Sequence, residues 1–311
     1  MVFAALLFCA MGCGTPSVYP AAPQALPPDG TAGNCAENLG APAAARGAGY
    51  RRLSFCDDFE TISTIDLDAT GAPGFKWYTN VPFRDQKPNS RNNYSVANSA
   101  LTVVANLHAA GWGLSTMDPI TGSGKAWKFG YFEARISLDP SLASKSVDHP
   151  AFWSVSAYAT LNHTYSWSEL DFFEAPKTAP SSEFAGTLHD WRNFSVAGGV
   201  APGYKTPTDI ANSNYRQPVN IDWTRWHVVG TLWEPGMVTW YWDGVALMTQ
   251  RYSAGSFPVP AAQTWTGGVA PPVGTFAGMD QEQMGQQIIL GSGPGWPLIV
   301  DWVRVWQKDQ Q

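Results

Sequence analysis

Charge is scarce in this sequence, and basic side chains do not cluster anywhere along it. Only 14% of the 311 residues are charged, where about a quarter is usual for globular proteins. The 19 Lys and Arg are outnumbered by 25 Asp and Glu, which gives a net charge of −6, and no basic run exceeds two residues. Because binding to phosphates requires clustered cations, these numbers exclude a nucleic-acid partner.

Long apolar runs are also missing, and the one apolar stretch lies at the start. Residues 2–13 are apolar but too few to span a bilayer, which is typical of an export signal. The sequence AMGC, which ends at Cys13, resembles a bacterial lipobox, where Cys13 would carry a lipid anchor to the membrane. An ordinary cleaved signal peptide is the alternative. We therefore predict an exported protein, either extracellular, or periplasmic and anchored in the outer membrane if Cys13 is lipidated.

Cysteine is rare, with four residues in the chain. Cys9 and Cys13 lie in the predicted signal, so Cys35 and Cys56 remain. Export favours a disulfide between them, and two free thiols are the alternative. The absence of a C-x-x-C motif or a Cys/His cluster excludes a zinc site of the usual kinds.

Helical periodicity is missing almost throughout the chain. From residue 50 onward, runs rich in β-branched and aromatic residues are separated by Gly, Pro, Asn and Ser, which predicts many strands. Residues 238–248 contain Asp243-Gly244, a pair that favours a tight hairpin turn. Residues 279–288 form the one plausible short helix. Many strands without interleaved helices predict an all-β sandwich.

The composition predicts three segments. Residues 1–13 form the signal peptide, and residues 14–49, rich in Pro, Ala and Gly, form a flexible tether. Residues 50–308 form one domain, with no internal repeat and no second linker. The sequence gives no sign of an oligomer, so we expect a monomer.

Aromatic residues are abundant, with 15 Trp, 11 Tyr and 15 Phe. Such a surplus of Trp suits a surface that stacks on sugar rings, because the C–H faces of sugars pack on aromatic rings. A large aromatic core is the alternative.

Three acids stand close together in SELDFFEAP, residues 168–176. Side chains alternate between the two faces of a strand, so Glu169 and Asp171 share a face and Glu174 has the opposite parity. A one-residue bulge at Phe172–Phe173 would turn Glu174 to the same face. A solvated strand with acids by chance is the alternative, but the surrounding apolar residues argue against unpaired charge there.

Three carboxyls on one face suit the cleavage of a glycosidic bond with retention of configuration. That reaction uses two carboxyls about 5 to 5.5 Å apart, one ionised and attacking, the other protonated and donating to the leaving oxygen. A third acid between them can help to hold their pKa values apart. The residues alone therefore favour a glycoside hydrolase.

The motif ELDFFE resembles the ExDxxE signature of glycoside hydrolase family 16, whose members include laminarinases, agarases and carrageenases. Seven further blocks resemble the family in the usual order: FCDDFE (55–60), NYSVANSALTV (93–103), FGYFEARISL (129–138), HPAFW (149–153), TLHDW (187–191), WHVVGTLWEPGMVTWYWDGVAL (226–247) and VDWVRVWQ (300–307). The resemblance covers about residues 50–308. It implies a concanavalin A-like jelly roll with a concave substrate cleft.

The resemblance also implies roles for individual residues. Glu169 would be the nucleophile, Asp171 the assisting acid, and Glu174 the general acid and then the general base. His189 would contact the acid/base. Further substrate-binding candidates are Trp153, Trp167, Asn93, Trp191 and Trp112.

A structural calcium is implied too, since many relatives bind one between the first and last strands. Glu60 and Asp301 fall in the corresponding blocks, and catalysis needs no cofactor. The bulged motif implies endo-acting hydrolysis of a β-1,3-glucan of the laminarin type. A galactan such as agarose or porphyran, transglycosylation, or a non-catalytic lectin-like module are the alternatives. The sequence lacks the Trp-Pro-x-x-Gly run that often precedes the motif in laminarinases, so the substrate stays open.

Overall fold

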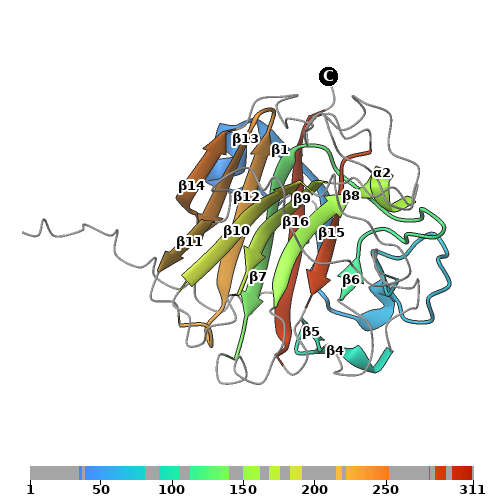
Figure 1. The fold of residues 1–311 in the computed structure, drawn as a ribbon. Helices are drawn as coiled ribbons and strands as arrows, with labels where there is room; N and C mark the ends of the chain where they lie inside the picture. The colour runs from blue at the N-terminus through green and yellow to red at the C-terminus, as the bar shows by residue number, and fades with distance from the viewer. Residues whose placement is uncertain are drawn as a thin grey trace, which may run out of the picture.

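Two β-sheets packed face to face form the body of the molecule (Figure 1). The computed structural model describes residues 35–36, 39–80, 91–104, 113–139, 150–161, 168–175, 183–190, 215–218, 222–251, 280, 284–291 and 296–309. Every named strand pair is antiparallel except one short parallel pair, β2 with β3. The all-β sandwich predicted from the strand pattern is therefore confirmed.

The first sheet, called here the β7 sheet, holds the chain's first and last described strands side by side. Its order is β14 (Val245–Arg251), β13 (Met237–Trp242), β12 (His227–Glu234), β7 (Gly130–Ser137), β16 (Leu298–Lys308), β5 (Ala100–Val103) and β4 (Tyr94–Ala97), with β1 (Tyr50–Asp57) also paired to β16.

The second sheet, called here the β9 sheet, carries the acidic motif. Its order is β11 (Tyr215–Pro218), β10 (Glu183–Asp190), β9 (Ser168–Glu174), β8 (Ala151–Ser156), β15 (Gln286–Gly291), β6 (Leu114–Ser115), β3 (Trp77–Tyr78) and β2 (Ile65–Asp66). Among the described residues, four short helices accompany the sheets: α1 (Ala43–Gly47), α2 (Ala157–Leu161), and the 3₁₀ turns η1 (Ile62–Thr64) and η2 (Arg91–Asn93). No helix in the described part of the chain is long and apolar enough to cross a membrane.

The core between the sheets is strongly aromatic. Trp233, Trp240 and Trp242 project into it from the β7 sheet, and Phe172 and Phe173 project from the β9 sheet. Each of these side chains is less than 2% exposed. Much of the Trp content therefore fills the core, which was the alternative to a sugar-binding surface.

The predicted hairpin turn at Asp243-Gly244 is confirmed. It connects β13 to β14, and both residues have positive φ angles, 47° and 79°. Two consecutive positive φ angles characterise the type I′ turn, which Asp-Gly adopts at little cost. The Asp243 carboxylate accepts hydrogen bonds from the Val228 backbone N–H and from the His227 ring, each at 2.8 Å, so the turn is fixed to the neighbouring strand.

The predicted helix over residues 279–288 is wrong at its C-terminal end. Gln286, Gln287 and Ile288 belong to β15, which lies between β8 and β6. The two Gln side chains find hydrogen-bond partners inside the fold, on Ser168, Ser115 and Thr160. Those contacts, distant in sequence, outweigh the helical preference of a Gln-rich segment.

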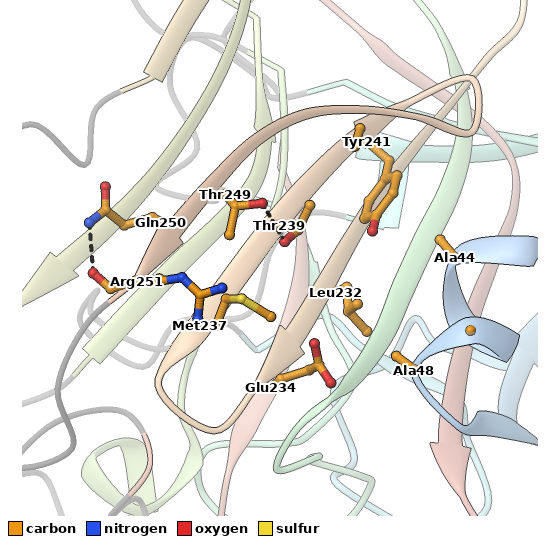
Figure 2. A pocket seen from close by; sticks show the side chains of 12 residues that line it. Ala44, Ala48, Leu232, Glu234, Met237, Thr239, Tyr241, Thr249, Gln250 and Arg251 are labelled. Carbon is orange, nitrogen blue, oxygen red and sulfur yellow. Dashed lines mark hydrogen bonds between the residues drawn. The ribbon is translucent and has the colours of Figure 1, made fainter.

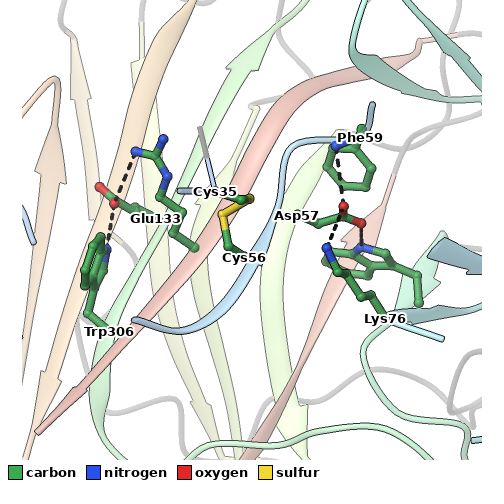
Figure 3. Close-up of a disulfide and its surroundings, with 9 residues drawn as sticks. Cys35, Cys56, Asp57, Phe59, Lys76, Glu133 and Trp306 are labelled. Atoms are coloured by element: carbon green, nitrogen blue, oxygen red, sulfur yellow. Dashed lines mark hydrogen bonds and ion pairs between the residues drawn. A yellow bond between two sulfur atoms is a disulfide. The ribbon is translucent and has the colours of Figure 1, made fainter. Parts of the chain in front are cut away.

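The predicted tether is shorter than expected, because an ordered segment begins well before residue 50. A disulfide joins Cys35 to Cys56 in β1 (Figure 3). Residues 39–48, which include α1, then cross the outer face of the β7 sheet, where Ala45 is fully buried against a cluster that includes Tyr131 and Trp306. Small Ala side chains let the segment approach the sheet closely, so a composition typical of linkers here forms a packed strap.

Candidate active site

The three acids lie on β9, whose pairing with both neighbouring strands is interrupted at the same place. Toward β8, Asp171 is opposite Trp153 and Phe173 is opposite Phe152, so Phe172 is an extra residue. Toward β10, Asp171 is opposite Thr187 and Glu174 is opposite Ala185, so Phe172 and Phe173 both face Gly186. The bulge predicted at Phe172–Phe173 is confirmed from both sides.

The register also fixes which way the acids face. Residues directly opposite each other in an antiparallel pair point to the same face of the sheet. Glu169, Asp171 and Glu174 are opposite residues 155, 153 and 151 of β8, which alternate regularly and share one face. All three acids therefore project from the same face of the β9 sheet.

The other face of β9 explains why two aromatic residues stand together in the motif. Phe172 stacks on Phe132 with ring centroids 4.8 Å apart, and Phe173 packs against Trp223 at 5.3 Å. Both rings are fully buried in the core between the sheets. Two consecutive residues can point into the core only because the bulge interrupts the alternation.

The acid-bearing face lies outside the sandwich core. Trp153, opposite Asp171, is partly exposed and packs on Val155 and Ile289 in a small cluster separate from the core. Glu169 and Glu174 are partly exposed, whereas Asp171 is 1% exposed. The outer two acids can therefore reach a ligand from solvent while the middle one is covered, and Trp153 offers a ring beside them.

A buried polar network lies on the same face of the β9 sheet as the acids, on the far side of β8 from them. The Ser115 hydroxyl donates to Gln287 Oε1 at 2.6 Å, and Gln287 Nε2 donates to Thr160 Oγ1 at 2.7 Å. Gln287 is opposite Val155, which in turn is opposite Glu169, so the network continues the row of the first acid. These residues could not be predicted from the sequence, because the three lie on segments far apart in the chain.

The remaining substrate-binding candidates are placed only in part. His189 is the backbone partner of Glu169 in β10. Trp112, Trp167 and Trp191 lie outside the described residues. Asn93 ends η2 at the edge of the β7 sheet, where it is 5% exposed and its carbonyl accepts from the Val104 N–H at 2.8 Å. Its predicted role in substrate binding stays a prediction.

The calcium candidates do not form a fitting ion site among the described residues. Asp301 is paired with the Arg135 guanidinium, and Glu60 is exposed. A calcium ion needs six to eight oxygen ligands, and an Arg already bound to the carboxylate opposes a cation there. Within the described ranges, no group of three or more His, Cys, Asp or Glu is placed to hold a metal.

A groove of about 830 Å³ lies on the opposite side of the molecule, on the outer face of the β7 sheet (Figure 2). It runs between α1 and strands β12, β13 and β14, and its lining includes Tyr241, Met237, Glu234 and Arg251. Its polar rim includes a hydrogen bond between the hydroxyls of Thr239 and Thr249. The groove is thus separated from the three acids by both sheets.

The comparisons with known proteins agree with the fold. No family model and no curated protein matches the sequence. Among solved structures, a laminarinase from Flavobacterium sp. UMI-01 is similar at 13% identity, with a TM-score of 0.51, over 82% of this chain and all of that one. A non-specific endo-β-1,3(4)-glucanase of glycoside hydrolase family 16 named SCLam, a mutant co-crystallised with 1,3-β-D-cellotriosyl-glucose, is similar at 17% identity, with a TM-score of 0.50, over 83% of this chain and 95% of that one. The jelly-roll fold implied by the resemblance to that family is confirmed.

Proposed function

We propose that this chain, which has the fold of glycoside hydrolase family 16 structures, is an endo-acting, retaining glycoside hydrolase. The observation that carries the proposal is the bulge in β9, because it brings Glu169, Asp171 and Glu174 to one face of the sheet. A strand that carried acids by chance could keep regular pairing with β8 and β10, whereas β9 is interrupted on both sides. The partly exposed Trp153 beside Asp171 supports a sugar ring as the ligand.

The proposed reaction has two steps. In the first, the Glu169 carboxylate attacks the anomeric carbon and Glu174 donates its proton to the departing glycosidic oxygen, which leaves a glycosyl ester on Glu169. In the second, Glu174 takes a proton from water, and that water displaces Glu169 from the anomeric carbon. Asp171, between the two, would orient Glu169 through its buried carboxyl. Two inversions give overall retention.

The spacing of the two outer acids is compatible with this reaction. With one residue absorbed by the bulge, Glu169 and Glu174 lie about 13 Å apart along the strand, at about 3.3 Å per residue. Retention needs carboxyls about 5 Å apart, so each side chain must lean about 4 Å toward the other. A Glu side chain can extend that far from its Cα, with Asp171 beneath the space between the two carboxyls.

For the substrate we propose a β-1,3-glucan of the laminarin type. The support is the bulged motif, together with similar structures that are, by name, a laminarinase and an endo-β-1,3(4)-glucanase. Agarose or porphyran are the alternative substrates, and transfer of the glycosyl group to a sugar instead of water is the alternative outcome of the second step.

The test is the release of reducing ends from a panel of laminarin, lichenan, agarose and porphyran. Wild-type protein should cleave laminarin fastest, and NMR of the first products should show the β-anomer. Glu169→Gln and Glu174→Gln should each lower the rate by at least about 100-fold, since a positioned acid or base contributes that much or more. Unchanged hydrolysis in both variants would exclude this site.

A lectin-like module on the same fold is the candidate from a different class. Such a module would bind a polysaccharide in the same panel without releasing reducing ends. We favour the enzyme because both outer acids are present on the same face as Asp171.

We also propose that the protein is exported and monomeric. The support for export is the disulfide between Cys35 and Cys56, since such bonds persist in oxidising compartments. Labelling with radioactive palmitate in a bacterial host would distinguish lipidation at Cys13 from simple signal cleavage, because Cys13→Ala should abolish the label.

A further inference from the structure

One side chain of the opposite sheet reaches the catalytic strand through the core. Trp240 lies on β13 and is fully buried. Its indole Nε1 donates a hydrogen bond of 2.8 Å to the backbone carbonyl of Asp171, 69 residues away in the sequence. The bond therefore connects the two sheets at the residue immediately before the bulge.

The bulge explains why this carbonyl accepts a bond from the opposite sheet. Carbonyls in a regular antiparallel ladder point along the sheet to the neighbouring strand. A bulge disrupts the ladder locally and turns backbone groups out of register. A carbonyl turned toward a dry core needs a donor there, because leaving it unpaired would cost roughly 1 to 3 kcal/mol, and the Trp240 indole supplies that donor.

The strand opposite the bulge leaves room for the indole. Gly186 of β10 faces Phe172 and Phe173, and a Cβ atom added to it would lie 2.4 Å from Trp240 Nε1. The φ angle of Gly186 lies outside the left-handed region, so space, and not backbone conformation, requires glycine there. The bulge, the glycine and the indole are thus parts of one arrangement.

We propose that Trp240 is a positioning residue for the acids of β9. Its hydrogen bond holds the Asp171 carbonyl in the bulged conformation, and the bulge keeps Glu174 on the face of Glu169. This inference rests on the proposed function, because the position of Glu174 matters only if both acids act on one bond. Without the indole donor, the backbone between Asp171 and Glu174 relaxes, and Glu174 moves relative to the anomeric carbon that Glu169 attacks.

The test begins with Trp240→Phe, which keeps an aromatic ring but removes the donor. Trp306→Phe is the matched control, since it also removes a buried indole donor, the one bonded to Glu133 Oε1 at 2.8 Å, from a site on the outer face of the β7 sheet. We expect the laminarin turnover number to fall about 100-fold in Trp240→Phe, as expected for a misplacement of about 1 Å. It should stay within about 3-fold of wild type in Trp306→Phe. Circular dichroism and thermal melts establish that each variant is folded.

A second substrate identifies the cause of the loss. A dinitrophenyl glycoside of laminaribiose needs no proton for departure, so Trp240→Phe should retain a rapid burst of dinitrophenol. Hydrolysis of the glycosyl ester still needs Glu174 as a base, so the steady rate should be low. Azide attacks without a base, so it should restore turnover by releasing a glycosyl azide. A merely destabilised enzyme would show no such rescue.

Gly186→Ala should break the same hydrogen bond by changing β10 instead of the indole. It replaces Trp240→Phe as the test if that variant does not fold. Its added Cβ displaces the indole, so we expect the same loss and the same azide rescue, and a double variant should lose little more than either single one. Laminarin turnover within about 3-fold of the Trp306→Phe control, or a loss without azide rescue, overturns the inference. If wild-type protein cleaves no polysaccharide, the proposed function fails and the inference fails with it. If wild-type protein is active but the Trp240 and Gly186 variants are equally active, only the positioning role of Trp240 fails.

Discussion

Glu133 should make the stability of this protein depend on pH in an unusual direction. It lies on β7, 3% exposed, two residues from Tyr131, which packs against the strap of residues 39–48. Figure 3 shows Glu133 beside Trp306. The Trp306 indole donates to Oε1 at 2.8 Å, and Arg304 Nη1 is 4.0 Å from the same atom. Burial outweighs both of these contacts and raises the pKa of Glu133 from 4.5 to about 7.

The magnitude follows from this shift. A pKa difference of 2.5 between the folded and unfolded states corresponds to about 3 kcal/mol, at 1.36 kcal/mol per pKa unit. Because the folded-state pKa is the higher one, the folded protein binds this proton more tightly. The stabilisation is complete below pH 4.5 and is lost as the pH rises to about 7. Above pH 7 the carboxylate is ionised in a buried position.

Glu133→Gln tests this reasoning, because the amide keeps an acceptor for Trp306 and cannot ionise. Unfolding in guanidinium chloride should show a gain in the free energy of unfolding of about 3 kcal/mol at pH 8.5 and less than about 1 kcal/mol at pH 5. Glu60→Gln, at an exposed position, is the surface control. A variant that is less stable than wild type at both pH values would refute the argument, since it would mean that the charge pair with Arg304 outweighs burial.

Three further predictions concern stability. Replacing Cys35 and Cys56 together by Ala should cost about 3 kcal/mol in denaturant unfolding, the entropy of closing a loop with a sequence separation of 21; equal stabilities with and without reductant in wild type would contradict this. Asp243→Ala should cost about 2 to 4 kcal/mol, because it removes an acceptor for a backbone N–H and for His227 at a turn with positive φ, and Asp243→Asn should recover most of the loss. EDTA should shift the melting temperature by less than about 1 °C, since the Asp301 carboxylate is already bound to an Arg; a larger fall would restore the calcium hypothesis.

The fold was predictable where local chemistry decides the structure. Asp243-Gly244 forms its turn because these two residues tolerate positive φ, whatever lies around them. Residues 286–288 form a strand where the sequence predicts a helix, because their partners are remote: Gln287 bonds Ser115 across a sequence separation of 172. The strap has the composition of a linker for the same reason, since Ala45 is buried by strands that follow it in the chain.

The candidate site also has features that the sequence predicts and features that it does not. The bulge could be inferred from the parity of three acids, because alternation along a strand is a local property, and the structure confirms it. The polar network around Gln287 and the indole of Trp240 could not be inferred, since nothing near either residue in the sequence indicates a partner. Which sugar the proposed enzyme would accept depends on contacts beyond the strand, so the motif restricts the proposed reaction more than the proposed substrate.

The sequence of β9 explains how a bulge can be specified and not merely tolerated. In an unbulged strand with Glu169 and Asp171 outward, strict alternation would turn Phe172 inward, Phe173 out into water and Glu174 into the core. Burying a second Phe contributes about 1.5 to 3 kcal/mol, and keeping an ionised Glu out of the core avoids a larger cost. The bulge satisfies both demands, but it turns the Asp171 carbonyl toward the core, and there Trp240 and Gly186 become necessary. The order of apolar and acidic residues in β9 thus favours the bulge, and Trp240 of β13 and Gly186 of β10 stabilise it.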